Sequence, residues 1–308
     1  MRRALVLGLV GCSVISAVAE FKQRAPPLRR SLSSLLELAD HSHGRFDVKS
    51  HVQKLEDKFP HVVPENMLIG HMSAVLGKHG FTPATAINMV STCRDEICHS
   101  FTATLAKVWD KPSFDISSLA GMVFCGSTGF KAAMAHAPVG PDGKERYVFW
   151  VASHMALSGA NEAGEVWRPG RDKPSHACGA LLAVLKAIQT GKLHLQLQHD
   201  DVEMSLIKQE VLDYVEYGHV PDLTELTYAV HECILDRVQK TADSAVNLKD
   251  CEYVIISGIQ VHTGFTQNFF WPGTATLYSE AGSVDLMGEY KASVAQDKRD
   301  MFAGLVMV

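Results

Sequence analysis

The spacing of apolar residues divides the chain from residue 47 onward into helices and short buried strands. Amphipathic helices are predicted over Lys49 to Phe59 and Pro64 to Gly80, where Pro64 suits a helix start and Gly80 a helix end. Short apolar runs then alternate with helical patterns, which indicates strands that are each followed by a helix. The predicted strands are Ala86 to Thr92 and Met122 to Cys125, and the helices after them are Glu96 to Val108 and Phe130 to Ala137.

The second half of the chain continues this alternation. Arg146 to Ala152 is the clearest strand, and the chain then enters a long Gly-bearing loop over Ser158 to Ser175. The further predictions are helices over Ala177 to Gly191, Asp201 to Tyr217 and Asp222 to Thr241, and strands over Tyr253 to Val261 and Thr274 to Tyr278. Strand, tight turn and helix in succession are typical of an α/β fold, here a central sheet flanked by helices with a helical N-terminal lead-in. Since no repeat or linker interrupts residues 47–308, we expect a single domain there.

The first 46 residues have the composition of a targeting leader. Arg2 and Arg3 precede an apolar run from Ala4 to Val18, and the small residues at 17–19 suit cleavage, which predicts a signal peptide over residues 1–19. The run is shorter than the roughly 20 residues of a membrane-spanning helix, and we expect no span in the mature chain. Residues 20–46 begin basic, Ser-bearing and poor in acid, like a transit peptide. We therefore expect entry into the secretory pathway and delivery to a plastid surrounded by extra membranes, with secretion as the alternative.

Charge and cysteine content narrow the classes of function. The chain has 29 Lys+Arg against 34 Asp+Glu, a net charge of −5, and no basic segment that would give a nucleic-acid-binding face. Seven cysteines are too few for a disulfide scaffold at this length, so some are available for metal or redox chemistry.

Reactive side chains are predicted where strands end, because open α/β folds bind ligands at the carboxyl ends of their strands. Cys93 follows the strand that ends at Thr92, His154 ends the strand that begins at Arg146, and Cys178 begins a helix. A helix N-terminus favours a thiolate, and two thiolates with one imidazole can bind a catalytic zinc whose fourth position is left to water. The spacing of these residues matches no short zinc-finger pattern and is not diagnostic by itself.

Other cysteines and histidines remain open as alternatives. Cys125 also ends a predicted strand, and His176 lies two residues before Cys178, so each rivals a candidate ligand. Any one of these cysteines, taken alone, also fits an ordinary buried core position. The remaining candidates are interpreted as structural: His136, His262, Cys98, Cys233 and Cys251.

Several sequence blocks together resemble one known family. In chain order they are Cys93-Arg94-Asp95-Glu96, Gly126-Ser127-Thr128-Gly129-Phe130, Trp167-Arg168-Pro169-Gly170-Arg171, Ser175-His176-Ala177-Cys178-Gly179-Ala180-Leu181, Ser257-Gly258-Ile259-Gln260-Val261-His262-Thr263 and Phe270-Trp271-Pro272. They are similar to the blocks of the low-CO2-inducible protein B family, the Cys-Gly-His-rich proteins also called theta carbonic anhydrases. The resemblance runs from about Asp47 to the C-terminus and implies a β-carbonic-anhydrase-like fold, a homodimer and a bound zinc.

The resemblance also implies roles for particular residues. The zinc ligands would be Cys93, His154 and Cys178, and Asp95 matches the aspartate of the Cys-x-Asp motif of β-type carbonic anhydrases. In those enzymes an arginine two positions after the aspartate pairs with it, but here that position is an isoleucine. Two arginines could replace it, Arg94 and Arg171. We take Arg94 as the catalytic partner because it is nearer to Asp95 in the sequence, with Arg171 as the second candidate.

The implied function is zinc-dependent interconversion of CO2 and bicarbonate, in a CO2-concentrating pathway of an alga. Zinc makes hydroxide available at neutral pH, and we expect Asp95 to orient the bound water while Arg94 keeps this carboxylate off the metal. The alternative is a zinc-bearing, non-catalytic family member that acts as a binding or regulatory partner in CO2 acquisition. A thiol-redox enzyme and a zinc deaminase are disfavoured, because the sequence has no Cys-x-x-Cys, His-x-Glu or Pro-Cys-x-x-Cys motif.

Overall fold

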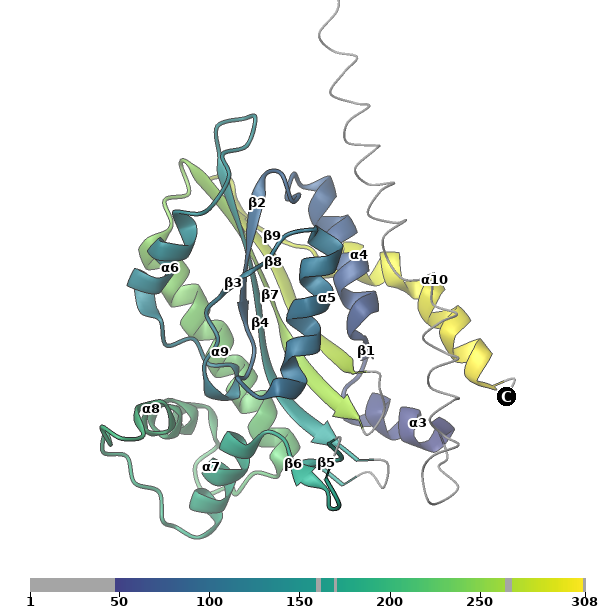
Figure 1. The fold of residues 1–308 in the computed structure, drawn as a ribbon, viewed down its shortest axis with the longest axis vertical. Coiled ribbons are helices and arrows are strands. Elements are labelled where there is room, and N and C mark those ends of the chain that lie inside the picture. Colours follow the sequence, from purple (N-terminus) through teal and green to yellow (C-terminus); the bar gives the residue numbers. More distant parts are fainter. Residues whose placement is uncertain (1–47, 159–161, 169–170, 264–267, 307–308) are drawn as a thin grey trace, which may run out of the picture.

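A mixed sheet of seven strands forms the centre of the computed structural model, which describes residues 48–158, 162–168, 171–263 and 268–306 (Figure 1). The strand order is β1-β8-β7-β4-β2-β3, and β9 pairs with β8. The strands are β1 (Val63–Pro64), β2 (Ala86–Ser91), β3 (Phe114–Asp115), β4 (Glu145–Leu157), β7 (Cys251–Thr263), β8 (Phe269–Ser279) and β9 (Gly282–Asp285). A separate ribbon pairs β5 (Glu165–Val166) with β6 (Ser175–His176). The predicted α/β fold with a central sheet is confirmed.

The four strands β3, β2, β4 and β7 run parallel, and β8 returns antiparallel to β7. Their near-continuous burial explains the apolar runs in the sequence, because a parallel sheet is covered on both faces. The register places His154 of β4 beside Gln260 of β7. Parallel strands end at one edge, so the side chains that follow β2, β4 and β7 meet at that end of the sheet.

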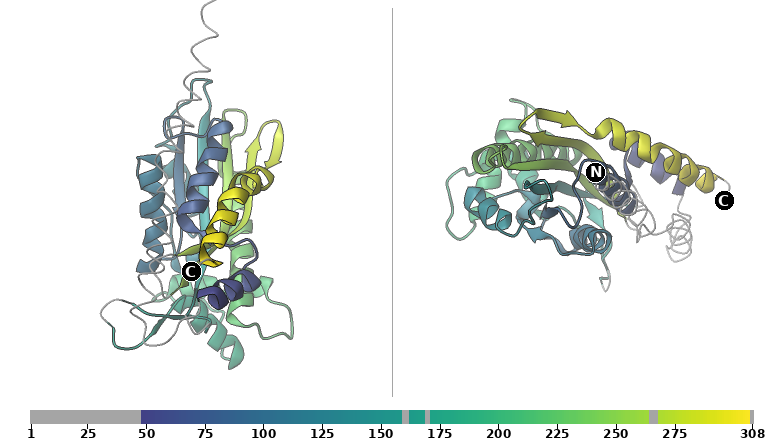
Figure 2. Two further views of the ribbon diagram at one scale, coloured as in Figure 1. Left: turned by 90° about the vertical axis from the view of Figure 1, so that its right-hand side faces the viewer. Right: turned by 90° about the horizontal axis from the view of Figure 1, so that it is seen from above.

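Helices cover both faces of the sheet (Figures 1 and 2). Alternate residues of β4 supply the two cores, with Phe149 facing one layer and Trp150 the other. The first layer contains α6 (Gly126–Met134), α7 (Gly179–Gln189), α8 (Val202–Val211) and α9 (Leu223–Ala245), and the second contains α4 (Glu65–Lys78), α5 (His99–Trp109) and α10 (Met287–Val306). The lead-in helix α3 (Val48–Lys58) continues into Phe59, which stacks on Tyr228 of α9.

One strand prediction is wrong. Met122 to Cys125 forms no strand, and the short β3 takes the place beside β2. The buried hydroxyl of Ser91 donates to the carbonyls of Gly121 and Met122. A side chain therefore provides hydrogen bonds that a neighbouring strand would otherwise provide to this backbone. The sequence reading also omitted β9 and α10.

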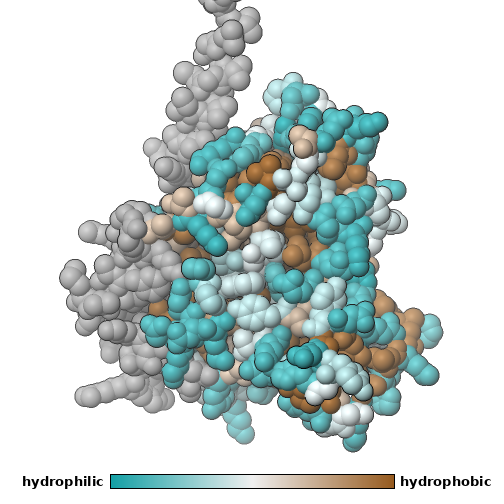
Figure 3. Space-filling view, turned by 180° about the vertical axis from the view of Figure 1, so that it is seen from behind, coloured by the Kyte–Doolittle hydropathy of each residue, from teal (hydrophilic) through white to brown (hydrophobic). Residues whose placement is uncertain are grey.

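The predicted leader, residues 1–46, and part of the loop over Ser158 to Ser175 lie outside the described residues. Across the ranges that are described, no helix has both the length and the apolar content to cross a membrane. Seen from behind, much of the surface is polar, but apolar side chains gather at the end that carries α7 and α8 (Figure 3). Leu195 and Leu197, in the connection between these helices, are among the exposed apolar residues.

Candidate metal centre

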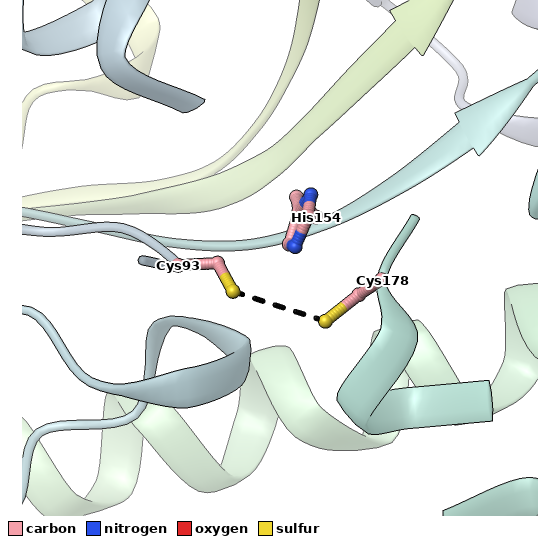
Figure 4. Close-up of side chains that lie close together, drawn as sticks. All are labelled: Cys93, His154 and Cys178. Atoms are coloured by element: carbon pink, nitrogen blue, oxygen red, sulfur yellow. Dashed lines mark hydrogen bonds between the residues drawn. The ribbon is translucent and has the colours of Figure 1, made fainter. Parts of the chain in front are cut away.

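Three side chains from distant parts of the chain converge at the carboxyl end of the sheet (Figure 4). Cys93 lies two residues after β2, His154 is within β4, and Cys178 immediately precedes α7. Their ligand atoms lie within 4.8 Å of one another, and the residues are 4%, 0% and 1% exposed. The structure thus brings together the three residues that the sequence singled out.

The arrangement fits a tetrahedral metal ion. The sulfur atoms of Cys93 and Cys178 are 3.9 Å apart, too far for a disulfide and close to the separation of about 3.8 Å that zinc–sulfur bonds of ~2.3 Å give in a tetrahedron. Within the described structure both ring nitrogens of His154 are buried without a regular hydrogen bond, which is costly unless something else binds them. Two sulfurs and one imidazole nitrogen are also a donor set that zinc favours.

The electrostatics of the two thiols favour one thiolate. The pKa of Cys93 is lowered to about 4, chiefly because the Cys178 thiol donates a hydrogen bond to it and His154 lies beside it. The backbone N–H of Ala120 also donates to the Cys93 sulfur, at 3.3 Å. The same contact and burial raise the pKa of Cys178 well above its ordinary value, although the N–H groups at the start of α7 oppose this. The pair therefore shares one proton, which a metal ion would displace.

Asp95 forms a bidentate ion pair with Arg168. Nη1 and Nη2 of Arg168 each donate to one oxygen of Asp95, both at 2.8 Å, and each side chain is 14% exposed. Burial opposes ionisation of Asp95, but this pair lowers its pKa to about 2 and raises the pKa of Arg168. Arg168 also bonds to Glu96, to the Ser175 hydroxyl and to a backbone carbonyl, so its position is fixed from several sides.

This pairing corrects the expected role of Arg94. Its side chain is 59% exposed and forms an ion pair with Glu203, turned away from Asp95. Arg171, the second candidate, is exposed and is not the partner either. The partner is Arg168, 73 residues from Asp95, on the loop before β6. The signal for Arg168 was its place in the quoted block from Trp167 to Arg171, but local spacing from Asp95 could not identify it.

A second buried group adjoins the first and was missed in the sequence. Cys98 and His262, interpreted as structural, form with His154 another set whose ligand atoms lie within 4.8 Å. The Cys98 sulfur is 3.5 Å from Nε2 of His262, and the rings of His262 and His154 meet edge to face at 5.2 Å. Burial raises the pKa of Cys98 and lowers that of His262 to about 3, so both are neutral. They form a neutral layer behind His154.

The rival ligands lie elsewhere. Cys125 directly precedes α6, where its carbonyl accepts from the N–H of Gly129, and it does not join either group. The His176 side chain is exposed on β6, and only its carbonyl takes part, as an acceptor for Arg168. His136 packs edge to face on Phe114.

The fold and this site define an α/β protein with a buried Cys-His-Cys group, suited to a metal ion, at the carboxyl end of a parallel sheet. The sequence matches the family of limiting CO2-inducible proteins B/C, described as beta carbonic anhydrases, over residues 62–279, and the chain belongs to that family.

Solved structures show the same fold. The crystal structure of the limiting CO2-inducible protein LCIB is 25% identical, with a TM-score of 0.63 over 75% of this chain and 96% of that one. PtLCIB4, a homologue of LCIB, is 23% identical, with a TM-score of 0.66 over 76% of this chain and 98% of that one. A search of curated proteins found no match.

Proposed function

We propose that this protein is a zinc-dependent carbonic anhydrase that interconverts CO2 and bicarbonate. The observation that carries the proposal is the convergence of Cys93, His154 and Cys178 beside an ionised Asp95, in a chain of a carbonic-anhydrase family. Zinc is the metal of choice because two thiolates and one imidazole suit it.

Cys93, His154 and Cys178 would hold the zinc and leave one position open. Bound zinc supplies hydroxide at neutral pH by lowering the pKa of water, and it needs no redox chemistry to do so. Burial of the three side chains excludes bulk water from the centre, which strengthens every charge interaction there.

The Asp95–Arg168 pair would orient the reacting water. Arg168 engages both oxygens of Asp95, so the carboxylate is held off the metal position while an unused lone pair can accept a hydrogen bond. Fixing a carboxylate in this way is worth more for catalysis than its charge alone, since a small misplacement of a catalytic group costs much of the rate. Arg168 therefore takes the role that the sequence reading gave to Arg94.

Zinc content and stopped-flow CO2 hydration, measured on the full chain, test the proposal. Wild type is expected to contain one zinc per chain and to hydrate CO2 rapidly, and Cys178→Ala is expected to lose both. Cys125→Ala is the matched control, because it removes another thiol near a helix start and should change neither.

The outcomes separate the competing functions. Zinc without hydration would overturn the enzyme and favour the non-catalytic alternative, a zinc-bearing binding or regulatory partner in CO2 acquisition. Protein without zinc, or loss of zinc in Cys125→Ala and not in Cys178→Ala, would overturn the ligand assignment.

The cellular setting is also a proposal. The leader composition supports delivery through the secretory pathway to a plastid, which fluorescence of a fusion carrying residues 1–46 would test against secretion. The exposed Leu195 and Leu197, between α7 and α8, support a homodimer, which light scattering of the purified chain would test.

A further inference from the structure

Glu65 is a buried carboxyl group that the proposed mechanism does not use. It is the first residue of α4 and is 4% exposed. Within the described structure its partners are two neutral side chains, and no cation pairs with it. A lone buried carboxyl is expensive to keep, so a function is expected where the fold retains one.

The inner partner of Glu65 reaches toward the metal centre. Nε2 of Gln260 donates to Oε1 of Glu65 at 2.8 Å. Gln260 is fully buried and lies beside His154 in the ladder between β4 and β7. His262, two residues further along β7 and so on the same face, packs on the His154 ring, which shows that these side chains share one layer. The side chain of Gln260 therefore lies between Glu65 and His154.

The outer partner of Glu65 reaches solvent. The Ser100 hydroxyl donates to Oε2 of Glu65 at 3.0 Å and accepts from the Asn268 amide at 2.9 Å. Ser100 is exposed, near the start of α5. A hydroxyl can donate and accept at once, so it can pass a proton between a buried group and a base in solution.

We propose that Glu65 is the proton-transfer group of this protein, carrying the proton released by CO2 hydration from the buried centre to solvent through Ser100. This inference rests on the proposed function. Hydration breaks an O–H bond of water, forms the C–O bond of bicarbonate and leaves one proton. Arg168 holds Asp95 as a paired carboxylate, which orients the water through a remaining lone pair but does not keep its proton, so the proton needs another acceptor.

The transfer balances with a buffer base in solution as the final proton acceptor. The O–H bond of the reacting water would break and its proton would form an O–H bond on the Glu65 carboxylate, with water bridging the gap, because the Gln260 amide positions Glu65 but relays no proton. Glu65 would then donate to Ser100 as Ser100 passes its own hydroxyl proton to a buffer base. Carboxylate and hydroxyl are restored, and dehydration of bicarbonate runs the same steps in reverse. Burial raises the pKa of Glu65 to about 7, although the bonds from Gln260 and Ser100 oppose this. The group is therefore matched to a solvent near neutrality, as transfer in both directions requires.

Stopped-flow hydration by the full-length zinc protein at low and high buffer concentration tests the role of Glu65. Glu65→Gln keeps the shape and the hydrogen bonds of a neutral carboxyl but cannot carry a proton. Its kcat at low buffer is expected to fall by about tenfold or more, with kcat/KM for CO2 nearly unchanged. Imidazole at high concentration should restore kcat, because it accepts the proton directly. Glu289→Gln, on the exposed side of α10, is the control and should behave like wild type.

Ser100→Ala provides a second, exposed variant that does not disturb the core. It should also lower kcat at low buffer and recover with imidazole. Equal loss of kcat and kcat/KM without rescue would mean that Glu65 only supports the structure, and an unchanged kcat in both variants would likewise overturn the inference. Hydration by wild type in either of these cases would leave the proposed function standing. Absence of hydration by wild type would overturn both.

Discussion

Removing the Arg168 guanidinium should disable the centre without emptying it. In Arg168→Ala, Asp95 loses both of its 2.8 Å hydrogen bonds and becomes an unpaired carboxylate in a site that is 14% exposed. Within the described residues, no hydrogen bond or ion pair joins Arg168 to Cys93, His154 or Cys178, so we expect a bound metal ion to stay. Asp95 would be free to turn toward the metal or toward solvent, and the reacting water would lose its orientation.

The structure sets the size of this effect. A hydrogen bond to a charged group contributes at least about 1.5 kcal/mol to stability, and we take this lower value because the site is partly exposed. Loss of the two bonds should therefore lower the unfolding free energy by about 3 kcal/mol. The bond to exposed Glu96 adds little, because surface ion pairs are weak. For hydration, the loss of a fixed Asp95 should reduce kcat/KM by about 100-fold. Arg168→Lys should have a stability and a kcat/KM between those of wild type and Arg168→Ala, since it keeps the charge but loses the bidentate geometry.

Urea denaturation, zinc content and hydration should be measured on both variants beside Arg94→Ala. Arg94 is adjacent to Cys93 in the sequence, but its exposed ion pair with Glu203 should cost less than about 1 kcal/mol and leave hydration intact. Equal loss of activity in Arg94→Ala and Arg168→Ala would refute the assigned pairing. Loss of zinc in Arg168→Ala would show that the pair holds the ligands and does not orient the water.

Three further outcomes follow from the geometry. Gly121→Ala should lower the unfolding free energy measured by urea denaturation by more than about 3 kcal/mol, because φ is +83° and a Cβ would lie 1.9 Å from the carbonyl oxygen of Ala152. The control Gly143→Ala, with φ +81° and open space around the new Cβ, should lower it by only about 1 kcal/mol. Burial raises the pKa of Glu65 from 4.5 to about 7, so the folded state binds this proton more tightly than the unfolded state does. Its contribution to the free energy of unfolding is therefore complete below pH 4.5 and is lost as the pH rises to about 7. As the pH rises from 4.5 to about 7, the unfolding free energy of Glu65→Gln should therefore increase by about 3 kcal/mol relative to that of wild type. A difference between the two proteins that does not change with pH would contradict the raised pKa of Glu65. Removing zinc with a chelator should lower the unfolding free energy by about 4 kcal/mol relative to protein with zinc at 1,000 times its Kd, which a melting curve with and without zinc would show.

Topology predicted that candidate ligands meet at one end of the sheet, but only the resemblance to the family selected Cys93, His154 and Cys178 over the rivals Cys125 and His176. Cys93 follows β2, His154 lies near the end of β4 and Cys178 directly precedes α7, and parallel strands bring such positions to one edge. The sequence could also predict that Cys178 begins a helix, since an apolar helical pattern follows it. No distance along the chain was needed for these inferences.

The Arg168 pairing was not predictable in the same way. It joins the turn after β2 to a loop without regular periodicity, and the path of such a loop depends on contacts that it makes only in the folded state. Searching near Asp95 selected Arg94 because that residue is close in sequence. A charged residue beside a buried site is free to turn to solvent when another cation occupies the position, and Arg94 does so.

The strand boundaries show how the buried polar residues of the site shorten the apolar runs in the sequence. The predicted strands stop at Ala152 and Val261, but β4 runs to Leu157 and β7 to Thr263. The predicted strands stop where buried polar residues follow, at Ser153 and His154 in β4 and at His262 in β7, and the buried Gln260 lies one residue before the predicted end of β7. A stable core alone would favour apolar residues at these positions, since buried polar groups cost free energy unless they are bound. Polar residues that interrupt the ends of two adjacent buried strands therefore mark a site, and they mark it before any ligand is known.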